Sequence, residues 1–240
     1  MPRTGRTVAI IQARMTSTRL PGKVMADLGG QPMIAAMLRR VYRSRRLDAV
    51  MVATSTNAAD DPVAAAAAAA DAGVFRGDEH DVLGRYALAA DVSGADTVVR
   101  ITGDCPLIDP AVIDGVVDLF AASDCDYASN VMQRTFPDGL DTEVFTRSVL
   151  RRADAEAIDR LHREHVTPYI RGNVPGHPGG DFRHVHYRFA ADFSHVRWTV
   201  DRPDDLDRVR RLWALLPENF SWIEALAAAT RDPRLLGLQV

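Results

Sequence analysis

At 240 residues, 47% hydrophobic and 25% charged, the chain has the composition of a globular protein and can bury a core without disulfides. A net charge of −3 argues against a nucleic-acid-binding protein, and the lack of an apolar run of about 18 residues argues against a membrane protein. Two cysteines are too few for a disulfide framework, so a reduced, cytoplasmic location is expected.

The first half of the sequence alternates apolar runs with helical patterns. The apolar runs predict buried strands over residues 7–13, 48–55, 73–75 and 95–104. Helical periodicity and prolines in the first turn predict helices over residues 32–46, 60–73, 81–93 and 109–123. The arginine-rich end of the first helix is expected to be solvated. Such alternation is typical of a parallel sheet with crossover helices, so we expect an α/β, Rossmann-like, mostly parallel sheet flanked by helices.

The second half is predicted to be less regular. Strands are expected over residues 126–130, within 136–145, over 177–189 and over 196–201, and helices over 146–159, 160–172 and 203–216. The period-two alternation in 177–189 indicates a half-exposed antiparallel strand. No linker divides the sequence, so we expect one domain, 1–240, with a small antiparallel excursion over 130–190.

A basic loop follows the first predicted strand. Residues 1–46 contain ten Lys or Arg and a single acidic residue, and part of this excess is the segment IIQARMTSTRLPGK, residues 10–23. Its cations are Arg14, Arg19 and Lys23, the only lysine in the chain. Ligands of open parallel sheets bind beyond the carboxyl ends of the strands. Guanidinium groups fork onto phosphate oxygens and an ammonium group is a compact point charge, so this loop predicts a polyphosphate site.

This segment also resembles the signature of a known family. ARMTSTRLPGK is similar to the A-R-x-x-S-x-R-L-P-x-K motif of the cytidylyltransferases that activate keto-sugar acids, the CMP-KDO and CMP-sialic acid synthetase group. Every fixed position matches: Ala13, Arg14, Ser17, Arg19, Leu20, Pro21 and Lys23. The motifs FRGDEHDVLGRY, RITGDCPLIDP, FPDGLDTEVF and REHVTPYI extend the resemblance to the SpsF-like branch of spore coat polysaccharide biosynthesis, over roughly residues 7–215.

The resemblance implies a fold of the nucleotide-diphospho-sugar transferase type and the transfer of CMP from CTP to an acidic sugar, with release of pyrophosphate. It also implies a homodimer, and it gives the 130–190 excursion a role in acceptor binding and dimerisation. Catalytic roles then fall to Arg14, Arg19, Lys23 and Asp104. The predicted nucleotide-binding residues are Ala13, Arg14, Ser17, Arg19, Lys23, Gly77, Arg85 and Thr102. Arg85 fits an ordinary helix surface equally well, and Thr102 stands where the KDO enzymes carry glutamine.

A magnesium site is expected beside the triphosphate, because Mg²⁺ prefers carboxylate and phosphate oxygens. Asp104 ends a predicted strand at the same edge of the sheet as the basic loop. Asp201, in WTVDRPDDL, resembles the aspartate that completes the magnesium site of the KDO enzymes. The alternative for Asp104 is a turn or a helix N-cap, and the alternative for Asp201 is a helix N-cap.

The acceptor is the least constrained part of the prediction. Asp141, Glu143 and His165 are expected to bind it; the alternatives are a strand with its polar face in water and, for His165, a hydrogen bond inside the fold. A nonulosonate or KDO-like acid is expected, with a phosphonate or an alditol phosphate as alternatives. A glycosyltransferase or another nucleotide-sugar-binding protein of related fold is the alternative function, although the Asp-x-Asp spacing at 124–126 precedes its strand rather than following it.

Overall fold

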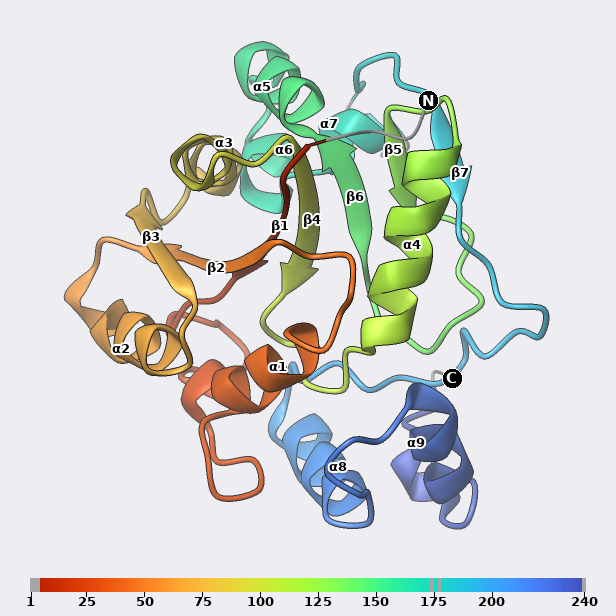
Figure 1. Cartoon of the computed structure of the whole chain (residues 1–240). Helices are drawn as coiled ribbons and strands as arrows, with labels where there is room; N and C mark the ends of the chain where they lie inside the picture. The colour runs from red at the N-terminus through yellow and green to blue at the C-terminus, as the bar shows by residue number, and fades with distance from the viewer. Residues whose placement is uncertain (1–4, 173–174, 177, 239–240) are drawn as a thin grey trace.

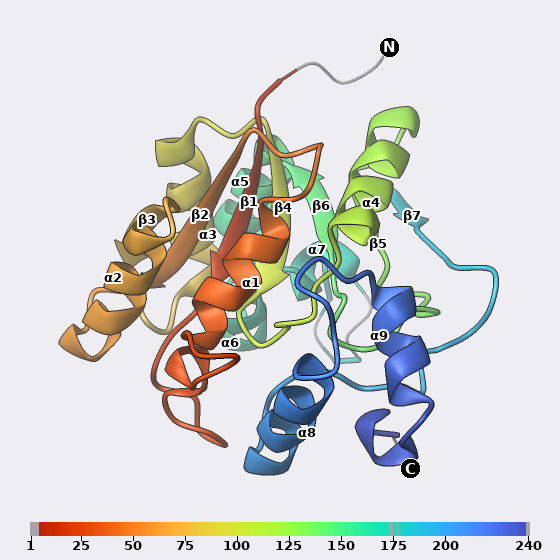
Figure 2. The same ribbon diagram turned by 60° about the horizontal axis from the view of Figure 1, so that its bottom comes forward.

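The computed structural model of the chain describes residues 5–172, 175–176 and 178–238. In this part of the chain a seven-stranded sheet has the order β3-β2-β1-β4-β6-β5-β7, with helices on both faces (Figure 1, Figure 2). The strands are β1 (Thr7–Gln12), β2 (Ala49–Ser55), β3 (Gly73–Gly77), β4 (Thr97–Thr102), β5 (Tyr127–Ser129), β6 (Glu143–Thr146) and β7 (His184–His186).

Helices follow most of the strands. The α-helices are α1 (Met33–Val41), α2 (Asp61–Ala69), α3 (Val82–Ser93), α4 (Pro110–Ala122), α5 (Arg147–Glu156), α6 (Arg160–His165), α7 (Pro168–Arg171), α8 (Pro203–Trp213) and α9 (Trp222–Ala229). Short 3₁₀ helices are η1 (Lys23–Met25), η2 (Ala58–Asp60) and η3 (Pro233–Leu235). No helix within the described ranges is long and apolar enough to cross a membrane.

The pairing confirms a mostly parallel sheet with an antiparallel part. β1 pairs in parallel with β2 and β4, and β2 with β3. β6 runs antiparallel to both β4 and β5. The carboxyl ends of β1, β2, β3 and β4 therefore meet at one edge of the sheet, and the loops that follow them lie together.

The apolar run of β1 is buried on both faces, which explains why it does not alternate with polar residues. Val8 and Ile10 belong to a core cluster under α3 and α5, whereas Ala9 and Ile11 belong to the cluster under α1, α2 and α4. A third cluster surrounds Trp198 where α8 and α9 pack together, beyond the end of the sheet toward which β4 points (Figure 1).

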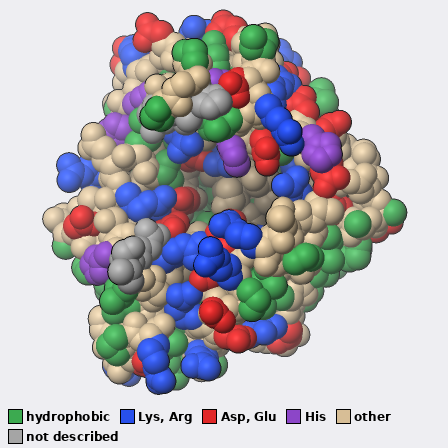
Figure 3. Space-filling view, turned by 180° about the vertical axis from the view of Figure 1, so that it is seen from behind, with side chains coloured by type: hydrophobic (Ala, Val, Ile, Leu, Met, Phe, Trp, Pro, Cys, Tyr) green, Lys and Arg blue, Asp and Glu red, His purple; other side chains and the backbone are tan. Residues whose placement is uncertain are grey.

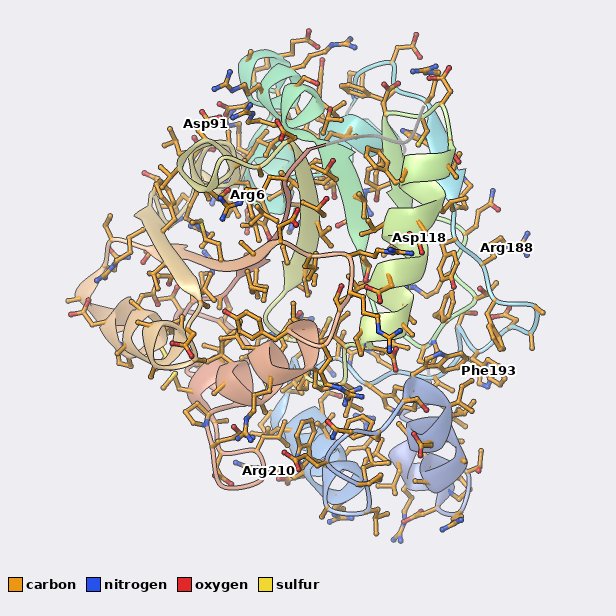
Figure 4. The ribbon with its side chains drawn as sticks, viewed as in Figure 1. Arg6, Asp91, Asp118, Arg188, Phe193 and Arg210 are labelled. Carbon is orange, nitrogen blue, oxygen red and sulfur yellow. The ribbon has the colours of Figure 1, made fainter. Side chains whose placement is uncertain are left out.

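Charges join the helices mainly at the surface. Asp91 of α3 pairs with Arg151 of α5 at 2.8 Å, and Asp118 of α4 pairs with Arg46 at 2.7 Å (Figure 4). Exposed pairs of this kind contribute at most about 1 kcal/mol each, so the apolar clusters provide most of the stability.

Two predicted strands of the second half are wrong. The segment predicted as a strand over 196–201 lies outside the sheet and makes one isolated bridge, between Arg197 and Asp138. It is buried because it packs in the third cluster, which also requires apolar residues. Within 177–189, of which residue 177 lies outside the described residues, β7 is only three residues long and parallel to β5, not antiparallel.

The predicted helices need smaller corrections. α1 ends at Val41, and its arginine-rich end is only partly solvated, because Arg40 is 2% exposed. The N-cap position of α2 is Asp60, whose side chain makes no capping hydrogen bond to the helix. The helix predicted over 160–172 is split into α6 and α7 by Val166, which has φ 70 and ψ −61. The N–H of Thr167 closes this γ-turn on the carbonyl of His165 at 2.8 Å, a strained geometry for a β-branched residue.

Candidate active site

The basic loop after β1 is held in a fixed shape from both ends. The N–H of Gly22 donates to the carbonyl of Met15 at 2.8 Å, and Gly22 has φ 74, a conformation that favours glycine. The N–H of Met15 donates to the carboxylate of Asp60 at 2.7 Å. Asp60 is fully buried and also accepts the N–H of Ser55 at 3.1 Å, so the end of β2 and the start of α2 anchor the loop.

Lys23 begins η1 at the end of this loop and points inward. It is 8% exposed, and its Nζ donates to Asp104 Oδ2 at 3.1 Å, to Asp201 Oδ1 at 3.0 Å and to the carbonyl of Val200 at 2.7 Å. One ammonium group thus lies between two carboxylates that are 97 residues apart in sequence, since 201 − 104 is 97. Lys23 therefore brings the end of the basic loop to the two aspartates, Asp104 and Asp201, that are predicted to bind the metal.

Two local contacts bring Asp104 and Asp201 together. Gly103 lets the chain leave β4 close to β1, because a Cβ at this position would lie 2.8 Å from the carbonyl oxygen of Gln12. The N–H of Val200 donates to the carbonyl of Asp104 at 2.9 Å. The 196–201 segment is therefore fixed to the end of β4 by its backbone, without joining the sheet.

Both carboxylates are surrounded by cations and hydrogen-bond donors. Burial raises the pKa of Asp104, but the charge of Lys23 and the hydroxyl of Thr102, which donates to Oδ1 at 2.6 Å, hold that pKa below its usual value. Asp201 also pairs with Arg19 at 2.8 Å and with Arg197 at 2.6 Å. Asp104 is therefore ionised at neutral pH and can act as an oxygen ligand.

These groups line a cavity of about 280 Å³ at the carboxyl edge of the parallel strands. On the side of the molecule opposite to that of Figure 1, a hollow is bordered by Lys and Arg side chains together with acidic ones (Figure 3). The lining residues are Gln12, Ala13, Arg14, Ser17, Thr18, Arg19, Lys23, Val24, Val82, Arg85, Thr102, Gly103, Asp104, Glu164, His165 and Asp201. Most of the predicted nucleotide-binding and metal-binding residues are in this set.

The first turn of α3 lines one side of the cavity, through Val82 and Arg85. The guanidinium groups of Arg14 and Arg85 both donate to the carbonyl of Glu79, each at 3.3 Å. Arg85 is buried, not a surface residue of the helix, and burial lowers its pKa. Gly77 does not line the cavity; it makes room for Arg85, whose Cγ would lie 3.0 Å from a Cβ at position 77.

The three predicted acceptor-binding residues lie in different surroundings. His165 lines the cavity, next to the γ-turn at Val166. Asp141 is outside the lining set and forms a bidentate pair with Arg134, at 2.5 and 2.8 Å. Glu143 is 2% exposed and binds Tyr127 at 2.5 Å and Arg100, so the structure places it inside the fold.

Sequence reasoning missed three polar residues of the cavity: Gln12, Thr18 and Glu164. Gln12 carried a usable signal. In the strand TVAIIQ only the first residue, Thr7, and the last, Gln12, are polar, and Gln12 stands at the carboxyl end of the strand. Glu164 has no such signal in a short, mostly charged helix.

The donor set suits a hard cation that also binds phosphate. Among the described residues, no group of three or more His, Cys, Asp or Glu could hold a metal on its own. Asp104 and Asp201 offer carboxylate oxygens around a point now taken by an ammonium group. One or two carboxylates completed by phosphate oxygens and water is the usual coordination of Mg²⁺ at nucleotides, so the residues fit such an ion.

Comparison with known proteins agrees with this geometry. The family model described as Cytidylyltransferase matches residues 8–226. The spore coat polysaccharide biosynthesis protein SpsF of Bacillus subtilis is 32% identical over 233 residues, covering 93% of this chain and 94% of that protein. A 3-deoxy-manno-octulosonate cytidylyltransferase of Anaeromyxobacter sp. is 32% identical over 245 residues, covering 88% of this chain and 98% of that protein.

Solved structures show the same fold. A cytidylyltransferase from Leptospira borgpetersenii has a TM-score of 0.90 at 33% identity, covering 99% of each chain. A CMP:2-keto-3-deoxy-manno-octonic acid synthetase complexed with CTP has a TM-score of 0.64 at 20% identity, covering 88% of this chain and 99% of that one, and this likeness concerns the fold. With its motif residues gathered in one cavity and its family model matched over almost its full length, this chain belongs to the cytidylyltransferase family, and it is a CTP-dependent nucleotidyltransferase.

Proposed function

We propose that the protein transfers CMP from CTP to an oxygen atom of an acidic sugar, with release of pyrophosphate. The observation that carries this proposal is the convergence of Lys23, Asp104 and Asp201 in a cavity at the carboxyl edge of the sheet. In the reaction, an acceptor oxygen attacks the α-phosphorus of CTP and loses its proton, while the bond from that phosphorus to the bridging oxygen breaks. The protein contributes by positioning the reactants and balancing charge.

The basic loop would hold the triphosphate. Arg19 has a side chain 58% exposed, so it can turn from Asp201 to phosphate oxygens without leaving a buried charge. Lys23 is buried and already aimed into the cavity, so it would meet the charge that develops on the leaving pyrophosphate. Arg14 and Ser17 line the same cavity and complete the nucleotide-binding loop.

Asp104 and Asp201 would hold Mg²⁺ through their carboxylate oxygens. When bound, this ion supplies positive charge that offsets the triphosphate and its leaving group. Lys23 occupies the space between the two carboxylates, so its ammonium group would move toward phosphate when a metal binds. The network of Thr102, Arg197 and Val200 would keep both carboxylates in place during this exchange.

The acceptor is proposed to be a KDO-like or nonulosonate acid, because related proteins are named for 3-deoxy-manno-octulosonate and for spore coat polysaccharide. His165 lies in the cavity and is the first candidate to bind it. Asp141, with Arg134, lies in the 130–190 excursion, for which we propose acceptor binding and homodimer contacts. A phosphonate or an alditol phosphate is the alternative acceptor.

The test is a thermal-shift and calorimetric titration with CTP, UTP, GTP, ATP and dTTP, each with and without Mg²⁺ or Mn²⁺. A ligand that binds the folded protein raises the melting temperature by an amount that grows with the logarithm of its concentration divided by its dissociation constant. Selective stabilisation by CTP that increases with the metal supports the proposal, and pyrophosphate release across keto-sugar acids then identifies the acceptor. An equal response to all nucleotides, or none, would contradict it.

A further inference from the structure

A buried ion pair beneath the cavity has no evident role in stability. Arg100 of β4 and Glu143 of β6 are directly opposite in the antiparallel register, and their side chains are 12% and 3% exposed. The next pair on the same face, Val98 and Phe145, is apolar and packs in the core. A buried ion pair is often no more stabilising than apolar residues of similar size, so stability alone does not explain this one.

The acidic partner of this pair is fully engaged. One oxygen of Glu143 accepts from Arg100, and the other accepts the hydroxyl of Tyr127 at 2.5 Å. Burial raises the pKa of Glu143, but the charge of Arg100 and the hydroxyl of Tyr127 bring it below the usual value, so the carboxylate stays ionised. Glu143 therefore holds Arg100 in place instead of reaching a substrate itself.

The second nitrogen of the guanidinium group points to the cavity wall. Arg100 Nη2 donates to Oε1 of Gln12 at 3.1 Å. A guanidinium group has only donors, so the atom of Gln12 that faces it must be the amide oxygen. The amide NH₂ is thereby turned the other way, and Gln12 is a lining residue of the cavity. Within the described residues, the structure gives this NH₂ no hydrogen-bond partner.

We propose that the NH₂ group of Gln12 donates a hydrogen bond to the cytidine half of CTP, and that the Arg100–Glu143 pair is a positioning device that fixes the orientation of this amide. The inference rests on the proposed binding of CTP in this cavity.

The surroundings of Gln12 favour the nucleoside over the phosphates. The cations Lys23 and Arg19 gather at Asp201, where the triphosphate is expected. Gln12 is paired in register with Thr102, and the apolar Val82 also lines the cavity. An uncharged donor suits the uncharged ribose and cytosine, whose oxygens and ring nitrogen accept hydrogen bonds, whereas phosphate is better served by cations.

The test compares CTP dissociation constants, measured by calorimetry in the presence of MgCl₂, for the wild type and four variants. Gln12→Met keeps the size of the side chain and removes the donor, and Glu143→Gln removes the charge that holds Arg100. The double variant combines them, and Gln31→Met is the control glutamine, outside this cavity. Melting temperatures are recorded for all, so that a folding defect is seen separately.

We expect Gln12→Met to weaken CTP binding about 3- to 10-fold, the effect of one hydrogen bond. Glu143→Gln should weaken it by a similar factor, and it should cost nothing further in the Gln12→Met background, because both changes remove the same contact. If Glu143 served the fold alone, Glu143→Gln would lower the melting temperature, and its effect on CTP affinity would add to that of Gln12→Met in the double variant. Wild-type affinity in Gln12→Met would overturn this inference alone, whereas a wild-type protein that binds no CTP would overturn the proposed function as well.

Discussion

The clusters around Lys23 and Arg40 both bury a cation beside a carboxylate, and they differ in what surrounds the cation. Lys23 lies between Asp104 and Asp201 and borders the cavity. Arg40, 2% exposed, stacks on the ring of Phe220 at 3.6 Å from its centroid and lies 4.0 Å from Asp109. Both have the composition of a functional site, yet they have different roles.

The difference lies in which groups each cluster has left for a ligand. Arg40 donates to the carbonyls of Ile108 at 2.8 Å and Phe220 at 3.2 Å, and Asp109 caps α4 while accepting the N–H of Trp222 at 2.6 Å. Burial lowers the pKa of Arg40 to about 10, and all of its partners belong to the fold. The Lys23 cluster instead borders the cavity, and the side chain of Arg19, one of the partners of Asp201, is 58% exposed, so Lys23 and Arg19 can exchange carboxylate oxygens for a bound ligand.

The largest expected effect is on stability, from Arg40→Met. Methionine keeps the contact with Phe220 but leaves two buried carbonyls without a donor and Asp109 without a cation. We expect a loss of about 3–5 kcal/mol in the free energy of unfolding, measured by urea denaturation. The folded fraction should release pyrophosphate at nearly the wild-type rate. Arg46→Met, at the exposed pair with Asp118, is the control and should cost less than about 1 kcal/mol. If Arg40→Met were stable but inactive, Arg40 would serve the activity and not the fold, and the two clusters would not differ in role.

Lys23→Ala should show the opposite pattern. We expect turnover to fall by about 10²-fold or more, because a charge aimed at the leaving group is lost. Its cost in stability should be smaller than that of Arg40→Met, since Asp201 keeps Arg19 and Arg197 and water can reach the cavity. Pyrophosphate release and urea denaturation on the same samples measure both. Normal turnover in Lys23→Ala would show that the role given to this lysine is wrong.

The sequence predicts the parts of this comparison that depend on local patterns. The strand–helix alternation and the loop at residues 13–23 follow from residues close together in the chain, and Asp104 could be placed because it follows a regular strand. The role of Arg40 could not be predicted, because a helix end rich in arginine has the same pattern whether one member is buried or all are solvated. Its partners Ile108 and Phe220 are 68 and 180 residues away.

The second half was harder to predict for a related reason. Val196 and Trp198 are apolar because they pack in the third cluster beside α8 and α9, and a buried coil and a buried strand both require apolar residues there. Glu143 stands in an alternating run that is equally typical of a solvated strand face. Its partner Arg100 is 43 residues away, so only the register of β4 with β6 reveals the pair.

Asp60 offers a third kind of buried charge, held by hydrogen bonds, and it gives the smallest predicted effect. Burial raises the pKa of Asp60, but the N–H groups of Met15 and Ser55 and the Ser55 hydroxyl lower it below the ordinary 3.8. Asp60→Asn should cost about 1–3 kcal/mol at pH 7, because an amide NH₂ would face donors.

A lowered pKa gives stability that is present above the unfolded value and is lost as the pH falls through the folded value. The wild type should therefore lose stability below about pH 3.8, and its advantage over Asp60→Asn should shrink there. Urea denaturation at pH 7 and pH 3 measures this. A difference that stayed constant between these pH values would mean that the charge of Asp60 does not hold the loop. CTP affinity at pH 7 is compared for Asp60→Asn and Arg40→Met. If it is weaker in Asp60→Asn and unchanged in Arg40→Met, the hydrogen bond from Met15 to Asp60 serves the cavity and not only the fold.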